Sequence, residues 1–230
     1  MIEHRPFASL GNTEVPGLTG RHHFCFARYQ HPERLEWDRL RIWNDCVLDA
    51  GAGRPPEHCD NFDIVTLVLA GSLHRPGSFG DHCRTGPGFV QILSTGAGSS
   101  VGLRADDDGA VSFHEIWLRS DRAYATPRCT TVRIGERDGW QLLGSGVSDE
   151  DSVPLTSRCR LLFGRLSPGI TLARETAGAS HAYLVPVRGS VEVNGETLDQ
   201  GSGAALAGEE RISLRTGGAA DIVLVESGFA

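Results

Sequence analysis

The segment Val191-Glu192-Val193-Asn194-Gly195-Glu196-Thr197-Leu198 decides the class of the fold. It contains two short runs with apolar residues, joined by the dipeptide Asn194-Gly195. A two-residue turn of type I′ needs a positive φ at both central residues, and Asn-Gly is the dipeptide that tolerates this best. The segment therefore predicts a β-hairpin.

Short apolar runs bounded by glycine, proline, asparagine or aspartate recur along the rest of the chain, which is typical of a sandwich or barrel. Helical periodicity is weak, and the segments Pro32–Arg39 and Asp149–Val153 predict single turns at most. The 29 glycines and 11 prolines show no collagen-like period and favour many turns over long helices. We therefore expect an all-β protein. The clearest predicted strands are Ile64–Leu69, Phe89–Leu93, Ser112–Leu118, Arg160–Leu166, Tyr183–Val187 and Ile222–Val225.

The two halves of the chain resemble each other weakly. The segment 68–73 (Val-Leu-Ala-Gly-Ser-Leu) is similar to the segment 186–191 (Pro-Val-Arg-Gly-Ser-Val). Each is followed by a turn and by a Gly-x-Gly that leads into an apolar strand, at Gly86-Pro87-Gly88 and Gly201-Ser202-Gly203. Two β-barrels in tandem explain this pattern, and so does the chance recurrence of Gly-Ser turns in any β protein.

Charge and composition narrow the class of partner. The 22 basic and 29 acidic residues give a net charge of −7, and no cluster of Lys and Arg in the sequence could follow a phosphate backbone. We expect no direct binding to nucleic acid. No apolar run approaches the roughly 20 residues of a membrane helix. The six cysteines form no CxxC pair, and their even number alone does not establish a disulfide framework. From these features together we expect a soluble, cytoplasmic protein with reduced thiols and no membrane partner.

Four segments of the N-terminal half carry a resemblance to a known family. They are His22-His23-Phe24-Cys25-Phe26-Ala27-Arg28-Tyr29, Leu40-Arg41-Ile42-Trp43-Asn44-Asp45-Cys46-Val47, Phe62-Asp63-Ile64-Val65-Thr66-Leu67-Val68-Leu69-Ala70-Gly71 and Gly88-Phe89-Val90-Gln91-Ile92-Leu93-Ser94-Thr95-Gly96-Ala97-Gly98. In order and spacing they resemble the pirin family of the cupin superfamily. The resemblance implies two tandem jelly-roll β-barrels. We expect an N-terminal cupin domain at 1–130, a linker at 131–154 and a C-terminal cupin domain at 155–230.

The same resemblance implies a metal site that this chain matches poorly. Pirins hold one iron-like metal in the N-terminal barrel, with ligands from a His-Pro-His segment and a His-x-Glu segment. The positions that match these ligands are Glu57, Cys59, Val101 and Leu103. Valine and leucine cannot bind a cation, and open catalytic sites usually keep three protein ligands. We therefore expect a degenerate metal site with no cofactor.

Three residues are candidates for chemistry in the N-terminal barrel. Glu57 in an apolar pocket would act as a general acid or base, whereas a loop glutamate would be exposed. Cys59 would be a nucleophile or a soft ligand, or else a small buried apolar residue. Glu115 is expected to face the barrel interior and share a pocket with Glu57, the alternative being a salt-bridged surface residue. His58 and His114 are expected to be surface or loop residues.

These residues support three hypotheses about function. In the first, the N-terminal barrel binds a small organic molecule and performs metal-independent acid–base chemistry of the isomerase, cyclase or lyase type. In the second, the protein is a quercetinase-like dioxygenase that holds iron or another divalent metal with ligands drawn from Glu57, His58, Cys59 and His114. In the third, the protein is a non-enzymatic regulatory binding module. The substrate, the protein partners and the oligomeric state are not predicted.

Overall fold

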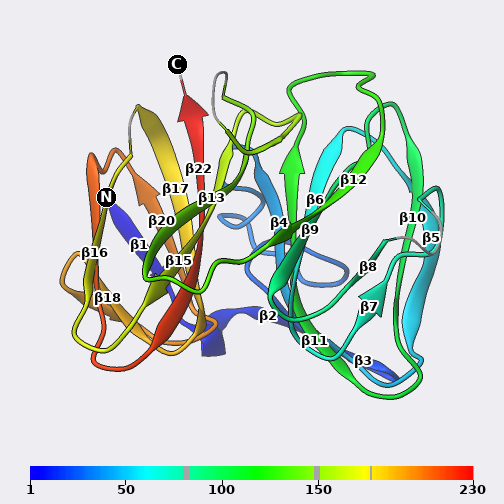
Figure 1. Cartoon of the computed structure of the whole chain (residues 1–230), viewed down its shortest axis with the longest axis horizontal. Coiled ribbons are helices and arrows are strands. Elements are labelled where there is room, and N and C mark those ends of the chain that lie inside the picture. Colours follow the sequence, from blue (N-terminus) through cyan, green and yellow to red (C-terminus); the bar gives the residue numbers. More distant parts are fainter. Residues whose placement is uncertain (80–82, 148–150, 177, 230) are drawn as a thin grey trace.

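The computed structural model describes residues 1–79, 83–147, 151–176 and 178–229. Strands dominate it, and the one helical element within this part of the chain is a 3-10 turn at Phe7–Ser9. Figure 1 shows two lobes side by side, each built mainly from one half of the sequence. No helix among the described residues is long and apolar enough to cross a membrane.

Each lobe contains one large and one small sheet of mainly antiparallel strands, as expected for a cupin domain. The large sheet of the N-terminal lobe has the order β12 (Arg128–Arg133), β9 (Phe89–Ser94), β6 (Phe62–Ala70), β11 (Val111–Arg119), β4 (Leu40–Leu48), β3 (Leu18–His22), β2 (Gly11–Val15). Its small sheet has the order β5 (Gly53–Cys59), β10 (Ser99–Ala105), β7 (Leu73–His74), β8 (Arg84–Thr85).

The C-terminal lobe repeats this plan. Its large sheet has the order β1 (Ile2–Arg5), β20 (Gly203–Ala207), β17 (Ala179–Arg188), β22 (Ala220–Phe229), β15 (Arg160–Leu166), β13 (Gly139–Ser145), β14 (Val153–Pro154). Its small sheet has the order β16 (Thr171–Glu175), β21 (Arg211–Arg215), β18 (Val191–Val193), β19 (Glu196–Leu198). The prediction of an all-β protein with two tandem cupin domains is confirmed.

The hairpin predicted from the sequence is present. β18 and β19 pair directly, and Asn194 and Gly195 between them have φ values of 48° and 95°. Both values lie in the left-handed region that a type I′ turn requires. The six predicted strands lie within β6, β9, β11, β15, β17 and β22. The segment Pro32–Arg39 contains turns but no helix, and residues 149 and 150 of the other predicted turn lie outside the described residues.

Strand pairing crosses the predicted division of the chain. β1, at the very N-terminus, pairs with β20 of the C-terminal lobe. β13 lies inside the predicted linker 131–154, yet it pairs with β15 in the C-terminal sheet. The sequence around a strand does not indicate which sheet the strand will join, because strand pairing depends on tertiary contacts. The linker boundaries therefore stay a prediction.

The two large sheets pack face to face and share one core. Trp43 and Val65 of the N-terminal lobe belong to the same buried apolar cluster as Tyr183 and Val223 of the C-terminal lobe. At the edge of this interface, the buried carboxylate of Asp63 accepts hydrogen bonds from backbone and side chain of the segment 156–157. The lobes are therefore joined by both apolar and polar contacts.

One pair of cysteines differs from the expectation of reduced thiols. Cys83, just before β8, forms a disulfide with Cys129 in β12, across 46 positions of sequence. An even cysteine count does not specify which residues the fold brings together, so this pair was not predictable from the sequence. The remaining thiols, at Cys25, Cys46, Cys59 and Cys159, are free.

Candidate functional site

The predicted site residues gather at one cavity of the N-terminal lobe. This cavity, of about 260 Å³, lies between the small sheet and the inner face of β11. Glu57 and Cys59 of β5 line it, as do Val101 and Leu103 of β10 and Glu115 of β11. Val101 lies opposite Glu57 in the ladder that joins β10 to β5. The structure thus brings these five side chains together, and their chemical roles stay predictions.

Glu115 forms the centre of a buried ion cluster. Its side chain is fully buried, and its two oxygens accept hydrogen bonds from different arginines, 2.6 Å from Nη2 of Arg54 and 2.9 Å from Nη2 of Arg75. Burial by itself raises the pKa of this carboxyl, but the charges and hydrogen bonds of the two arginines outweigh that effect and lower it to about 2. Glu115 is therefore an ionised anchor near neutral pH, which argues against its predicted part in proton transfer.

Arg54 reaches the cavity because β5 contains an irregularity. The ladder between β5 and β10 pairs Val101 with Glu57 and Leu103 with Arg54, so three steps on β5 match two on β10. The extra residue falls at Pro55-Pro56, where two prolines lack the N–H that a regular ladder needs. A bulge of this kind shifts the alternation of side chains by one position. Arg54, Glu57 and Cys59 consequently share one face.

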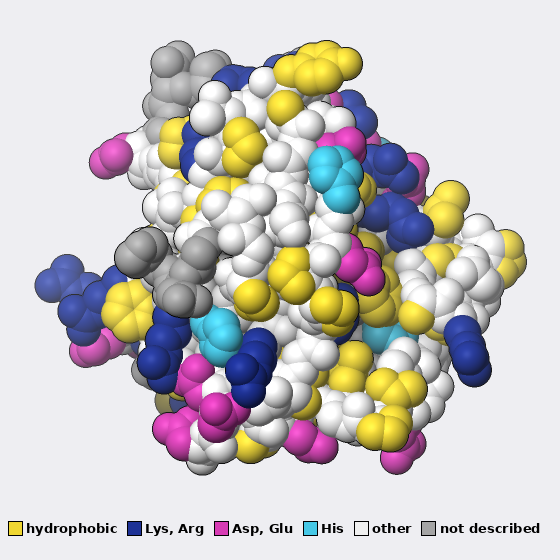
Figure 2. Space-filling view, turned by 90° about the vertical axis from the view of Figure 1, so that its right-hand side faces the viewer, with side chains coloured by type: hydrophobic (Ala, Val, Ile, Leu, Met, Phe, Trp, Pro, Cys, Tyr) yellow, Lys and Arg dark blue, Asp and Glu magenta, His cyan; other side chains and the backbone are white. Residues whose placement is uncertain are grey.

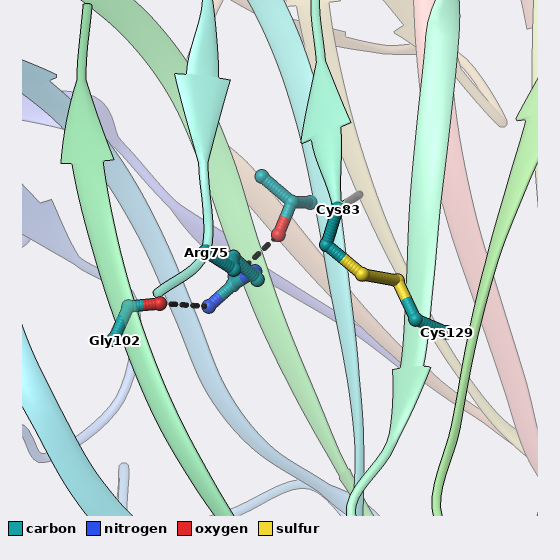
Figure 3. The surroundings of a disulfide bond; sticks show 5 residues. Arg75, Cys83, Gly102 and Cys129 are labelled. Carbon is teal, nitrogen blue, oxygen red and sulfur yellow. Dashed lines mark hydrogen bonds between the residues drawn. A yellow bond between two sulfur atoms is a disulfide. The ribbon is translucent and has the colours of Figure 1, made fainter. Parts of the chain in front are cut away.

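Arg75 is held rigidly on the other side of Glu115. Its side chain is only 2% exposed. Nη2 also donates to Oγ1 of Thr66 at 2.5 Å, and Nη1 donates to the carbonyl oxygen of Gly102 at 3.4 Å. Its backbone N–H donates to the carbonyl of Cys83, so the residue lies beside the Cys83–Cys129 disulfide (Figure 3). Burial lowers the pKa of Arg75 and the charge of Glu115 opposes this, and a guanidinium stays charged in either case.

Sequence reasoning missed both arginines. The Pro55-Pro56 pair after Arg54 was the available signal, because a strand with two adjacent prolines departs from regular pairing. Arg75 lies just beyond β7 and before Pro76, in a segment whose path depends on tertiary contacts alone. Neither residue stands in a motif that sequence spacing could reveal.

The thiol and imidazole groups near the cavity are poorly placed as reactive groups. Burial, the largest influence, and neighbouring acidic groups raise the pKa of Cys59 to about 11, so its thiol is protonated near neutral pH. His58 lines the mouth of the cavity with a side chain that is 73% exposed, as expected for a surface residue. A thiolate nucleophile needs the opposite shift of pKa.

The expectation that His114 is a surface or loop residue is wrong. Its ring is buried on the opposite face of β11 from Glu115, toward the interface between the lobes, where Nδ1 accepts a hydrogen bond from Nε1 of Trp43 at 3.3 Å. Strand alternation does turn the side chain of His114 away from the cavity. That face of β11 is not exposed, however, because the large sheet of the C-terminal lobe covers it. His114 therefore cannot join Glu57, His58 and Cys59 around a metal. No group of three or more His, Cys, Asp or Glu side chains that could hold a metal occurs in the described part of the chain.

The surface on this side of the molecule has mixed charge. Figure 2 views the side on which β5 and β10 lie, and basic and acidic side chains are interspersed across it. Such a surface provides no broad field to steer a highly charged macromolecule. On this face (Figure 2), the cavity is therefore the place where recognition by charge is expected.

Comparison with known proteins agrees with the fold. The Pirin family model matches residues 4–118, and the model of the quercetinase C-terminal cupin domain matches residues 142–226. A putative quercetin 2,3-dioxygenase from Pseudomonas aeruginosa is 35% identical over 98% of this chain and 99% of its own length. A pirin-like protein from Caulobacter vibrioides is 32% identical over 99% of this chain and 100% of its own length.

A solved structure gives the same result. The bacterial pirin YhhW from Escherichia coli, in complex with nickel(II), superimposes with a TM-score of 0.93 at 25% identity and covers 100% of both chains. The family models, the identities over nearly full length and this superposition all point to one assignment. The chain belongs to the pirin family.

Proposed function

We propose that the protein binds a small organic molecule in its N-terminal cavity and acts on it without a transition metal. The observation that carries this proposal is the cluster of Arg54, Glu115 and Arg75, which puts two guanidinium groups in the same cavity as the positions that match the family's metal ligands. Val101 and Leu103 add an apolar wall, which suits the body of an organic ligand.

The donor groups present do not fit the nickel of the relative or an iron centre. Glu57 and the mostly exposed His58 lie at the mouth of the cavity, and the thiol of Cys59 is protonated near neutral pH. A metal there would also stand close to Arg54 and Arg75, whose positive charges repel a cation. Three converging donors are the usual minimum for an open metal site.

Glu57 is the group that we propose for proton transfer. It lines the cavity and, unlike Glu115, makes no hydrogen bond or salt bridge with another side chain in the described ranges. A carboxylate that is not locked by guanidinium groups can exchange protons with a bound ligand. Chemistry of the isomerase, cyclase or lyase type requires a base of this kind.

Two measurements test this proposal. Plasma mass spectrometry of the protein after incubation with iron, nickel, zinc and manganese should find less than about a tenth of an equivalent of metal. Solvent deuterium incorporation into small carbonyl compounds, followed by NMR, should be abolished by Glu57→Gln and unaffected by chelators. Stoichiometric metal, or exchange that chelators abolish, would contradict the proposal.

The names of the relatives favour a second candidate, a metal-dependent quercetin dioxygenase. It would have to draw its ligands from Glu57, His58 and Cys59. Oxygen consumption on quercetin by metal-loaded protein, with none by the metal-free form, would establish this candidate and displace the first.

A further inference from the structure

The charges around the inner part of the cavity do not balance. Arg54 and Arg75 carry two positive charges, and Glu115, which both contact, carries one negative charge. Glu57 also lines the cavity, but its side chain is exposed, and water screens its charge. Arg75 is almost fully buried, where solvent screens its charge far less. The inner cluster of these two arginines and Glu115 therefore carries one surplus positive charge, which the exposed Glu57 near Arg54 offsets only in part.

Each guanidinium group also keeps donors that Glu115 does not engage. In the C-terminal lobe, the buried Glu226 accepts two hydrogen bonds from Arg174, at 2.9 and 3.0 Å, so that a whole edge of this guanidinium is engaged, and Nη1 of Arg160 lies 3.8 Å from the same carboxylate. Glu115 instead gives one oxygen to each of its two arginines. Nε of Arg75 is buried without a hydrogen-bond partner among the described residues. The N-terminal cluster thus retains hydrogen-bonding capacity beyond what its own carboxylate uses.

The two arginines differ in exposure and in the number of groups that hold them, in a way that suits ligand capture. Arg75 is fixed by Thr66, Gly102 and the backbone of Cys83. The side chain of Arg54 is 34% exposed, and its one hydrogen bond to a described residue goes to Glu115. A fixed guanidinium group beside a more exposed one can offer hydrogen-bond donors to a planar anion at a low cost in ordering, because only the exposed side chain has to adjust.

Apart from Glu57 and His58 at its mouth, the rest of the cavity is mostly apolar, and the cavity is small. Val101 and Leu103 form one wall, and the ring of Trp117 also contributes to the lining. A volume of about 260 Å³ lies below the roughly 300–1,000 Å³ that is common for ligand sites. A single surplus charge favours a monoanion over a doubly charged phosphate, and apolar walls favour an organic body over an inorganic ion.

We propose that the cavity binds a small organic carboxylate, with the carboxylate group on the guanidinium donors of Arg54 and Arg75 that Glu115 leaves free, and the apolar body against Val101 and Leu103. This inference rests on the proposed function, because it names the class of molecule that the cavity accepts. It places the rest of the ligand near Glu57, whose side chain lines the same cavity.

The experiment compares carboxylates with their neutral counterparts. Acetate, benzoate and cinnamate are each titrated against the full-length protein beside the matching primary amide, at neutral pH and constant ionic strength, and binding is followed by ligand-observed NMR. At least one carboxylate should bind about tenfold or more tightly than its amide, because charge-assisted hydrogen bonds to guanidinium are lost in the amide.

Two variants locate the binding. Arg54→Met should weaken the binding of that carboxylate by about tenfold or more and leave the circular dichroism spectrum unchanged. Arg104→Met is the matched control, because Arg104 lies on the neighbouring strand β10 and pairs with Asp107 outside the cavity. Its affinity should equal that of the unmodified protein.

The outcomes separate the two proposals. If the amides bind as tightly as the carboxylates, or if Arg54→Met binds as tightly as Arg104→Met, the carboxylate inference is overturned and small-molecule binding stands. If neither carboxylates nor amides bind, both proposals are overturned.

Discussion

Replacing Glu115 by Gln should destabilise the protein strongly at neutral pH. The change keeps the shape of the side chain but removes the charge that faces Arg54 and Arg75. The folded-state pKa of about 2, against an ordinary value of 4.5, corresponds to about 3 kcal/mol of stabilisation by the ionised carboxylate. Loss of one partner from a buried ion pair typically costs about 3–5 kcal/mol, and the stabilisation worked out for Glu115 agrees with the lower end of this range. Arg54 can turn toward water, whereas Arg75 cannot, so most of the cost comes from the buried charge of Arg75.

The pH dependence distinguishes this explanation from a simple packing defect. Because the pKa of Glu115 is lowered on folding, its stabilisation is complete above about pH 4.5 and is lost as the pH falls toward 2. The difference between the two proteins in urea unfolding, followed by tryptophan fluorescence, should therefore fall to less than half between pH 7 and pH 3. A difference below about 1 kcal/mol at pH 7, or one that does not change with pH, would refute the reasoning.

The matched control is Glu36→Gln. Glu36 pairs with Arg119 on the surface, where both side chains are more than one-third exposed. Exposed pairs contribute little, so this variant should stay within about 0.5 kcal/mol of the unmodified protein.

Three further measurements test other parts of the structure. Asp63→Asn removes a buried carboxylate that accepts hydrogen bonds from the segment 156–157, and it should lower the free energy of unfolding by about 3 kcal/mol in urea titrations; a loss below about 1 kcal/mol would contradict this. Reduction of the Cys83–Cys129 disulfide should lower stability by about 2–4 kcal/mol, and an unfolding midpoint that does not respond to reductant would show that the bond is absent or without effect. Alkylation of Cys59, followed by peptide mass spectrometry, should accelerate up to about pH 11 because the raised pKa leaves little thiolate at neutral pH; a rate that levels off near pH 9 would disprove the shift.

The strand pattern was readable from the sequence because it depends on local chemistry. The predicted strand Arg160–Leu166 coincides with β15, and Asn194-Gly195 forms the predicted turn. β1 and β13 were not assigned to the C-terminal sheet, because each is short or flanked by polar residues and gains its partner only in the folded protein. Local propensity thus predicts that a strand exists, and only tertiary contacts decide which sheet it joins.

The candidate site was predictable in part for the same reason. Family resemblance and alternation placed Glu57, Cys59 and Glu115 toward one cavity, and the structure has them there. Alternation fails across the irregularity at Pro55-Pro56, so Arg54 was not expected to point inward. A buried glutamate needs a partner, but the sequence could not say that the partner is a pair of arginines.

That pair of arginines limits the chemistry that the cavity can perform. Guanidinium groups supply charge and directed hydrogen bonds, and they can stabilise negative charge that develops on a bound carboxylate or enolate. They have no vacant coordination position, so they cannot activate dioxygen. In the proposed function, a carboxylate held by Arg54 and Arg75 reacts through proton transfer, and Glu57 is the group with the freedom to perform it. If carboxylate binding is found but Glu57→Gln leaves deuterium exchange unchanged, the cavity is a binding site rather than an active site.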